Sequence, residues 1–227
     1  VLRDIDPSCE VCVRVNPTGI AADDDLDVIL AGDPRIDSVM LPKVQSPDDA
    51  ETLARLLDEH DADLPVLALI ETAGGVLAAA DIARAGPVEA LLFGAEDLSA
   101  NIGATRTPEG TEVQYARQHV VLAASAAGID AIDTLYTDHD DPDGLRRDAR
   151  RAAEMGYDGK MAIHPDQVPV IADAFTPDAE AVAWAKRVLA AREQADTEDR
   201  AVFSVDGEMI DAPLVRQAER ILDRANE

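Results

Sequence analysis

Residues 64–71 read LPVLALIE and residues 90–98 read ALLFGAEDL, so two apolar runs each stop at acidic side chains. Apolar runs of this length, with helical segments between them, are typical of buried parallel strands. Parallel sheets and barrels carry their functional groups at the carboxyl ends of the strands. Two carboxylates delivered there, Glu71 and Asp97, make a site for a hard cation, most naturally Mg²⁺. The alternative is that each carboxylate only caps the helix that follows it.

Segments of strand and helix character alternate along most of the chain. Strands are expected at residues 11–15, 38–44, 66–71, 90–93, 131–134 and 160–163. Helices are expected at residues 22–31, 48–60, 75–85, 110–127, 142–154 and 166–174. Six β/α units in a row predict a parallel α/β fold. A closed (β/α)₈ barrel needs eight strands, so we expect two further strands to precede Val1, outside this sequence.

Several helix ends are marked by their residues. Ser46 and Asp141 each precede a proline and an acidic residue, the order expected of an N-cap and a first helical turn. Gly128 and Gly156 lie just past predicted helix ends, where a left-handed residue is favoured.

The pattern changes after Phe175. A helix is expected at residues 177–195, a short hairpin at 202–211 that turns at Asp206-Gly207, and a last helix at 213–225. We therefore divide the chain into a barrel domain, residues 1–175, and a C-terminal extension, residues 176–227, that contacts a neighbouring subunit.

The amino-acid composition limits the kinds of molecule that this protein is expected to bind. Acidic residues outnumber basic ones 46 to 20, which gives a formal net charge of −26 and excludes nucleic acid as an expected partner. Only Lys43, Lys160 and Lys186 are lysines. Acidic, lysine-poor surfaces suit concentrated salt, where the Debye length falls to about 3 Å. With no signal peptide and no membrane-spanning run, we expect a cytoplasmic protein from a halophile.

Six motifs, in order along the chain, resemble one known family. They are VRVNP at 13–17, MLPKV at 40–44, IET at 70–72, FGAEDL at 93–98, GKMAIHP at 159–165 and VDGEMID at 205–211. Together they resemble the citrate lyase β-subunit-like family of the HpcH/HpaI aldolase superfamily. The resemblance implies a TIM barrel of the HpcH/HpaI type, with about six of its eight strands in this sequence. It also implies a homotrimer or homohexamer.

The resemblance implies a role for four of the residues named above. Glu71 and Asp97 would hold Mg²⁺, with Mn²⁺ as a possible replacement. Arg14 ends a strand in an otherwise apolar segment; a buried arginine needs an anionic partner, and here that partner would be glyoxylate or another 2-oxo acid. A structural salt bridge is the alternative for Arg14. Asp206 would enter the active site of the adjacent subunit as the acid or base at the thioester α-carbon; from the sequence alone it is only a turn residue.

Further candidates surround these residues. Gly94, Ala95 and Glu96 offer backbone N–H groups at a strand-to-helix turn, and such groups suit a carboxylate. Gly94 could instead serve only the geometry of the turn. Lys43 and Lys160 occur in strand motifs, and each could lie near the CoA phosphates or the substrate carboxylate, or form an ion pair at the barrel mouth.

The predicted activity is Mg²⁺-dependent cleavage of a 3-hydroxyacyl-CoA thioester into an acyl-CoA and a 2-oxo acid. Malyl-, β-methylmalyl-, citramalyl- and citryl-CoA are all candidate substrates, and the sequence does not choose among them because such pocket differences are worth only about 1–3 kcal/mol. The alternatives are a malyl-CoA hydrolase resembling malate synthase, a CoA-free class II aldolase for 2-oxo acids, and a non-catalytic scaffold subunit.

Overall fold

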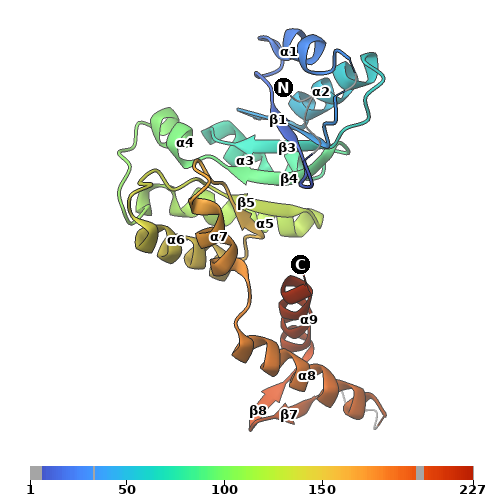
Figure 1. Cartoon of the computed structure of the whole chain (residues 1–227), viewed down its shortest axis with the longest axis vertical. Helices are drawn as coiled ribbons and strands as arrows, with labels where there is room; N and C mark the ends of the chain where they lie inside the picture. The colour runs from blue at the N-terminus through green and yellow to red at the C-terminus, as the bar shows by residue number, and fades with distance from the viewer. Residues whose placement is uncertain (1–6, 33, 198–201, 227) are drawn as a thin grey trace. The chain divides into compact units, whose positions relative to one another are not determined.

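The structure is a computed structural model that describes residues 7–32, 34–197 and 202–226. The chain divides into two compact units, Val1–Gln167 and Val168–Glu227, and each is described by itself. Figure 1 labels most of the helices and strands of both. No helix among the described residues is long and apolar enough to cross a membrane.

The first unit is built on a curled sheet of six parallel strands that lie side by side in chain order. The strands are β1 (Cys12–Arg14), β2 (Ser38–Leu41), β3 (Val66–Ile70), β4 (Val88–Phe93), β5 (Asp130–Asp133) and β6 (Gly159–Lys160). Because each crossover carries a helix, this arrangement confirms the predicted parallel α/β fold. The last strand is shorter than expected, since residues 161–163 lie outside β6.

Helices connect the strands. They are α1 (Ala22–Ile29), α2 (Pro47–Glu59), α3 (Ala73–Ile82), α4 (Ala95–Ile102), α5 (Gln114–Ala127), preceded by the 3₁₀ turn η2 (Thr111–Val113), and α6 (Pro142–Met155). The expected caps are present: the Asp141 carboxylate accepts the Gly144 N–H at 2.8 Å, and Gly128 and Gly156 end α5 and α6 with φ of +75° and +100°. The helix α4 is absent from the predicted set.

Side chains alternate between the two faces of the sheet, and both faces are apolar. One face carries a cluster built on Leu69, Ala90 and Leu92, with Met40 and Ile132 packed against it. The opposite face is covered by helices and carries fully buried residues such as Val39, Leu41, Ile70, Leu91 and Phe93. Burial on both faces explains why β3 and β4 read as continuous apolar runs rather than as alternating ones.

The second unit contains α7 (Gln167–Phe175), α8 (Ala179–Thr197), the antiparallel pair β7 (Phe203–Val205) and β8 (Glu208–Ile210), and α9 (Ala212–Asn226). The hairpin and both flanking helices agree with the predicted elements. Asp206 and Gly207 form the turn with φ of +53° and +86°, the left-handed pair that a two-residue hairpin requires. A small core centred on Val188, Ile210 and Ala218 holds α8, the hairpin and α9 together.

Candidate metal and substrate site

The two predicted carboxylates lie at the same edge of the sheet. Glu71 directly follows β3 and is 5% exposed, and Asp97 lies in the first turn of α4, directly after β4. Lys43, after β2, contacts both of them. Its backbone N–H donates to Glu71 Oε1 at 3.0 Å, and its Nζ donates to Asp97 Oδ1 at 3.3 Å. Three neighbouring strands therefore bring two acids and one base together.

The single positive charge of Lys43 does not offset the negative charges of Glu71 and Asp97. Burial first, and then the charge of Asp97, raise the pKa of Glu71, and with the opposing effect of Lys43 included the pKa is about 7. A buried carboxylate beside a second carboxylate is stabilised in its ionised form by a cation. This local excess of negative charge is what a divalent ion would offset.

The close contact between Gly94 and the Glu71 side chain leaves no room for a side chain at position 94. A Cβ atom at Gly94 would lie 2.6 Å from Glu71 Cβ and 2.9 Å from Glu71 Oε2. The backbone at Gly94 has φ −109° and ψ 92°, an extended conformation that any residue adopts. The turn geometry therefore does not require glycine here, and the close approach of the Glu71 side chain does.

The donor set of the pair fits Mg²⁺. The described residues hold no group of three or more His, Cys, Asp or Glu side chains arranged for a metal, so a site closed by the protein alone is not found among them. Mg²⁺ differs from zinc in this respect, because it is bound through one or two carboxylates and completes its shell with water and substrate oxygens. A pocket of about 380 Å³ lined by Glu71, Asp97, Lys43 and Asn101 leaves room for those ligands.

Arg14 is the last residue of β1 and pairs in register with Met40. That register puts Arg14 on the face of the sheet that carries the Leu69 and Leu92 cluster. Its side chain is exposed and makes no ion pair with any described residue. The premise that Arg14 is buried was therefore wrong for this structure, because β1 is the edge strand of the described sheet.

The N–H groups at the start of α4 are only partly open. The Gly94 N–H donates to Ile70 O at 3.0 Å, and the Ala95 N–H donates to Thr134 Oγ1 at 3.1 Å. The next two N–H groups, of Glu96 and Asp97, belong to the first helical turn and have no acceptor outside α4 among the described residues. These two are the ones open to a substrate carboxylate.

Lys160 lies on the other face of the sheet, in register with Asp133. Its fully buried Nζ lies 2.7 Å from Asp133 Oδ2 and 2.6 Å from Asp148 Oδ2. Arg117 forms a second bridge to Asp133 and Asp148, at 2.6 and 3.0 Å. Burial opposes ionisation of Asp148, but Lys160 and Arg117 outweigh it and lower its pKa. The structure thus places Lys160 in an ion-pair network under α5 and α6, apart from Glu71 and Asp97.

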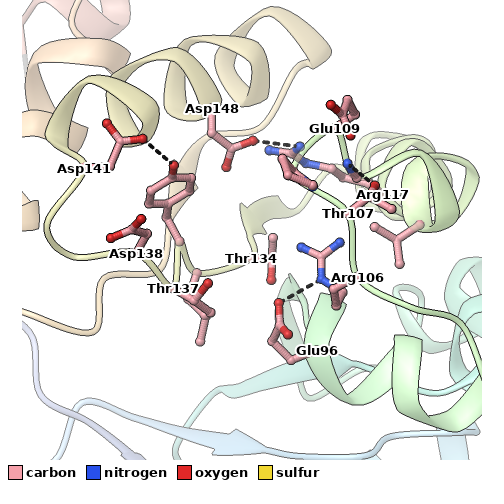
Figure 2. Close-up of a pocket in the computed structure, with 15 residues that line it drawn as sticks. Glu96, Arg106, Thr107, Glu109, Arg117, Thr134, Thr137, Asp138, Asp141 and Asp148 are labelled. Carbon is pink, nitrogen blue, oxygen red and sulfur yellow. Dashed lines mark hydrogen bonds and ion pairs between the residues drawn. The ribbon is translucent and has the colours of Figure 1, made fainter.

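A second pocket of about 500 Å³ adjoins the start of α4. Figure 2 shows Glu96 paired with Arg106 on one side of it, and Asp138 and Asp141 on the other. Arg106 Nε lies 2.8 Å from Glu96 Oε1. Thr134 lines this pocket as well. The Glu96 side chain is therefore engaged by Arg106.

Asp206 lies at the tip of the hairpin in the second unit. Its side chain is 62% exposed and accepts a hydrogen bond from Arg187 Nε of α8 at 2.9 Å. The carboxylate is thus presented on the surface of its unit, at a backbone position with φ +53°.

Two structurally important residues near the site were missed from the sequence: Thr134, which bonds to the start of α4, and Asp133, which belongs to the buried network around Lys160. A signal for them existed, because Asp133 ends β5 and Thr134 follows it, much as Glu71 and Thr72 follow β3. The acidic residue of β5 faces the helices rather than the carboxylate pair, and this depends on the register of the strand.

Known proteins similar to this chain are members of one enzyme family. The sequence profile of the family described as HpcH/HpaI aldolase/citrate lyase matches residues 2–165. The human protein named citramalyl-CoA lyase, mitochondrial, is 36% identical over 99% of this chain and 71% of its own length. The citrate lyase subunit beta-like protein of Mycobacterium tuberculosis is 40% identical over 100% of this chain and 80% of its own.

Solved structures show the same likeness. The crystal structure of protein CitE from Mycobacterium tuberculosis in complex with magnesium, acetoacetate and coenzyme A superposes with a TM-score of 0.80 at 38% identity, covering 95% of this chain and 78% of that one. A citrate lyase from Burkholderia xenovorans gives a TM-score of 0.83 at 26% identity, covering 96% of this chain and 72% of that one.

Proposed function

This chain belongs to the HpcH/HpaI aldolase/citrate lyase family, and from that premise we propose that it is a Mg²⁺-dependent lyase that cleaves a CoA thioester into an acyl-CoA and a 2-oxo acid. The observation that carries the proposal is the pair of carboxylates, Glu71 and Asp97, at the ends of adjacent strands beside an open pocket. The mycobacterial relative was crystallised with magnesium and coenzyme A, which supports the same chemistry here.

Citramalyl-CoA is the substrate that we favour, because the named relatives at 36% identity are citramalyl-CoA lyases. Its cleavage gives pyruvate and acetyl-CoA. The bond between the carbinol carbon and the thioester α-carbon breaks, and its electron pair passes into the thioester enolate. The proton that the hydroxyl loses is balanced by the proton that the α-carbon gains.

Glu71 and Asp97 would hold the Mg²⁺. A bound Mg²⁺ supplies Lewis-acid stabilisation of the substrate oxygen that becomes the carbonyl. The open N–H groups of Glu96 and Asp97 would orient the substrate carboxylate at the start of α4. Arg14, exposed on the face that carries the Leu69 cluster, would bind the 2-oxo acid and steady the charge on its oxygen.

Asp206 would deliver the proton to the α-carbon of the acyl-CoA enolate. Its carboxylate is exposed at a hairpin tip, so it is available to a neighbouring subunit of a homotrimer or homohexamer. Closure of such a hairpin over the substrate would also exclude water from the enolate. Lys43, which is exposed and contacts both carboxylates, would meet the substrate carboxylate or a CoA phosphate.

The six described strands are, in this proposal, part of a (β/α)₈ barrel of the HpcH/HpaI type. The support is the parallel order of the sheet and its likeness to the mycobacterial structure, which is longer than this chain.

A panel of thioesters tests the proposal. Protein is incubated in KCl and Mg²⁺ with malyl-, β-methylmalyl-, citramalyl- or citryl-CoA, and every product is identified by mass. Release of an acyl-CoA and a 2-oxo acid from one of them supports the lyase and names the acyl group. Free CoA without a 2-oxo acid would replace the lyase with a hydrolase, and no product from any thioester would reject the enzyme.

A further inference from the structure

The start of α4 is anchored at two points by hydrogen bonds from its first N–H groups. Gly94 N–H reaches back to Ile70 O, next to Glu71, at 3.0 Å. Ala95 N–H reaches across to Thr134 Oγ1, after the neighbouring strand β5, at 3.1 Å. Both ends of the second bond are buried, with Ala95 0% and Thr134 4% exposed. Removing the hydroxyl would therefore leave the buried Ala95 N–H without its protein acceptor.

The backbone of Thr134 is itself held in place by Lys160. The buried Nζ of Lys160 donates to Thr134 O at 2.5 Å while it bridges Asp133 and Asp148. The Thr134 backbone is thus tied to an ion-pair network that spans β5, β6 and α6. Its hydroxyl is presented toward α4 from a rigid support.

We infer that Thr134 is a positioning residue for Asp97, and that it acts through Ala95. Asp97 lies two residues beyond Ala95, in the same turn of α4, so the Ala95 bond sets where the Asp97 carboxylate stands relative to Glu71. The inference rests on the proposed metal site. Residues that orient metal ligands without touching the metal change affinity by about 10–100-fold when they are removed.

The hydroxyl of Thr134 also separates this role from simple packing. Valine has nearly the shape of threonine but offers no acceptor, so Thr134→Val removes the bond to Ala95 and little else. Thr134→Ser keeps the acceptor and removes a methyl group. A role in packing alone predicts that serine is at least as harmful as valine, whereas a positioning role predicts that serine restores function.

Ser38→Ala is the matched control for lost stability. Ser38 is 0% exposed, and its hydroxyl donates to Glu10 Oε1 at 2.9 Å. Ser38 starts β2, whereas Thr134 follows β5, and β3 and β4 lie between these two strands. The variant therefore loses a buried hydroxyl and its hydrogen bond without touching α4.

Two measurements on the full-length chain decide the matter. Isothermal titration with MgCl₂ gives the affinity for the metal alone, and hydrogen exchange by mass spectrometry reports the amides at the start of α4 without any metal. We expect Thr134→Val to weaken Mg²⁺ binding by about ten-fold and to speed exchange at Ala95. Thr134→Ser and Ser38→Ala should stay within about three-fold of the wild type in Mg²⁺ affinity.

Each contrary result has its own meaning. Unchanged exchange in Thr134→Val would show that the hydroxyl does not hold α4, and would overturn the inference. Faster exchange with unchanged Mg²⁺ affinity would overturn the link to Asp97. Equal weakening by Ser38→Ala would make the effect one of stability and would overturn it too. A wild-type chain that binds no Mg²⁺ would overturn the proposed function together with the inference, and the wild-type titration alone reveals that case.

Discussion

Gly94 and Glu71 lie so close that no side chain fits between them: a Cβ atom at Gly94 would stand 2.6 Å from Glu71 Cβ. The contact joins the ends of β3 and β4, the two strands after which the candidate metal ligands lie. Gly94 is buried and its backbone is extended, so the constraint is one of space alone. The position of the Glu71 carboxylate therefore depends on a residue that has no functional group of its own.

The Gly94→Ala variant tests this dependence. The added methyl group must displace the Glu71 side chain, and we expect at least about a ten-fold loss of Mg²⁺ affinity, since small displacements of a ligand are costly. Titration with MgCl₂ measures it. Gly86→Ala is the control, because Gly86 has nothing within 4 Å of the site of its Cβ and no positive φ. An equal Mg²⁺ affinity in Gly94→Ala and the wild type would show that the Glu71 side chain accommodates the added methyl group without loss of metal binding.

Replacing Glu71 by glutamine should separate metal binding from stability. Glutamine keeps an acceptor for the Lys43 N–H but carries no charge to oppose Asp97. We expect Mg²⁺ binding to be lost and the free energy of unfolding of the metal-free protein to rise by on the order of 2 kcal/mol at pH 8. Urea unfolding with EDTA checks the second part. Glu89→Gln, on an exposed residue of β4, is the matched control, and a less stable Glu71→Gln protein would contradict the account.

The network around Lys160 predicts how stability changes in acid. The pKa of Asp148 is lowered, so its contribution is complete above the unfolded value of about 3.9 and is lost as the pH falls through the lower folded value. At pH 7 we expect Asp148→Asn to reduce the free energy of unfolding by about 1–3 kcal/mol. The deficit should shrink below about pH 4, where the wild type also loses the charge.

Urea unfolding of wild type and Asp148→Asn across this pH range measures the difference. Asp58→Asn, on the exposed face of α2, should show no such deficit. A deficit that stays constant from pH 7 into the acid range would mean that the charge of Asp148 is not what stabilises the fold.

Asp206 and Glu71 are expected to serve one active site from different subunits. Glu71→Gln and Asp206→Asn should each be inactive alone, and Asp206→Asn should keep the wild-type affinity for Mg²⁺. Co-expression of the two variants should restore part of the activity, because some sites then combine an intact Glu71 with an intact Asp206. The co-expressed variants could instead remain inactive in oligomers that are shown to contain both. That result would place Asp206 in the site of its own subunit or outside any site.

Much of the fold was predictable because its signals are local. Each of the six predicted strands overlaps an observed one, although residues 161–163 lie outside β6. The caps at Asp141, Gly128 and Gly156 began or ended helices as expected. The helix α4 was outside the predicted set, and it carries Ser99 and Asn101, residue types that favour caps and turns. In the structure, Ser99 Oγ donates to Ala95 O at 2.7 Å and Asn101 Oδ1 accepts the Ala73 N–H at 2.9 Å, so both polar groups are satisfied by neighbours.

The candidate site was predictable only where a residue lies just after its strand or in the first turn of the helix that follows. Glu71 and Asp97 meet because β3 and β4 are neighbours, and this order follows from the repeating β/α pattern. Lys160 could not be assigned in the same way, because a shift of one residue moves a side chain to the other face of a sheet. The bond between Thr134 and Ala95 spans 39 positions of sequence and depends on the exact height of β5 beside β4.

The central claim is that the Glu71 and Asp97 carboxylates support Mg²⁺-dependent cleavage of a CoA thioester. The most direct test follows citramalyl-CoA with the wild-type chain and with Glu71→Gln, in Mg²⁺ and in EDTA, and quantifies pyruvate and acetyl-CoA by mass. The account predicts equal amounts of both products from the wild type in Mg²⁺, none in EDTA and none from Glu71→Gln. Products that form equally well in EDTA, or from Glu71→Gln, would contradict it.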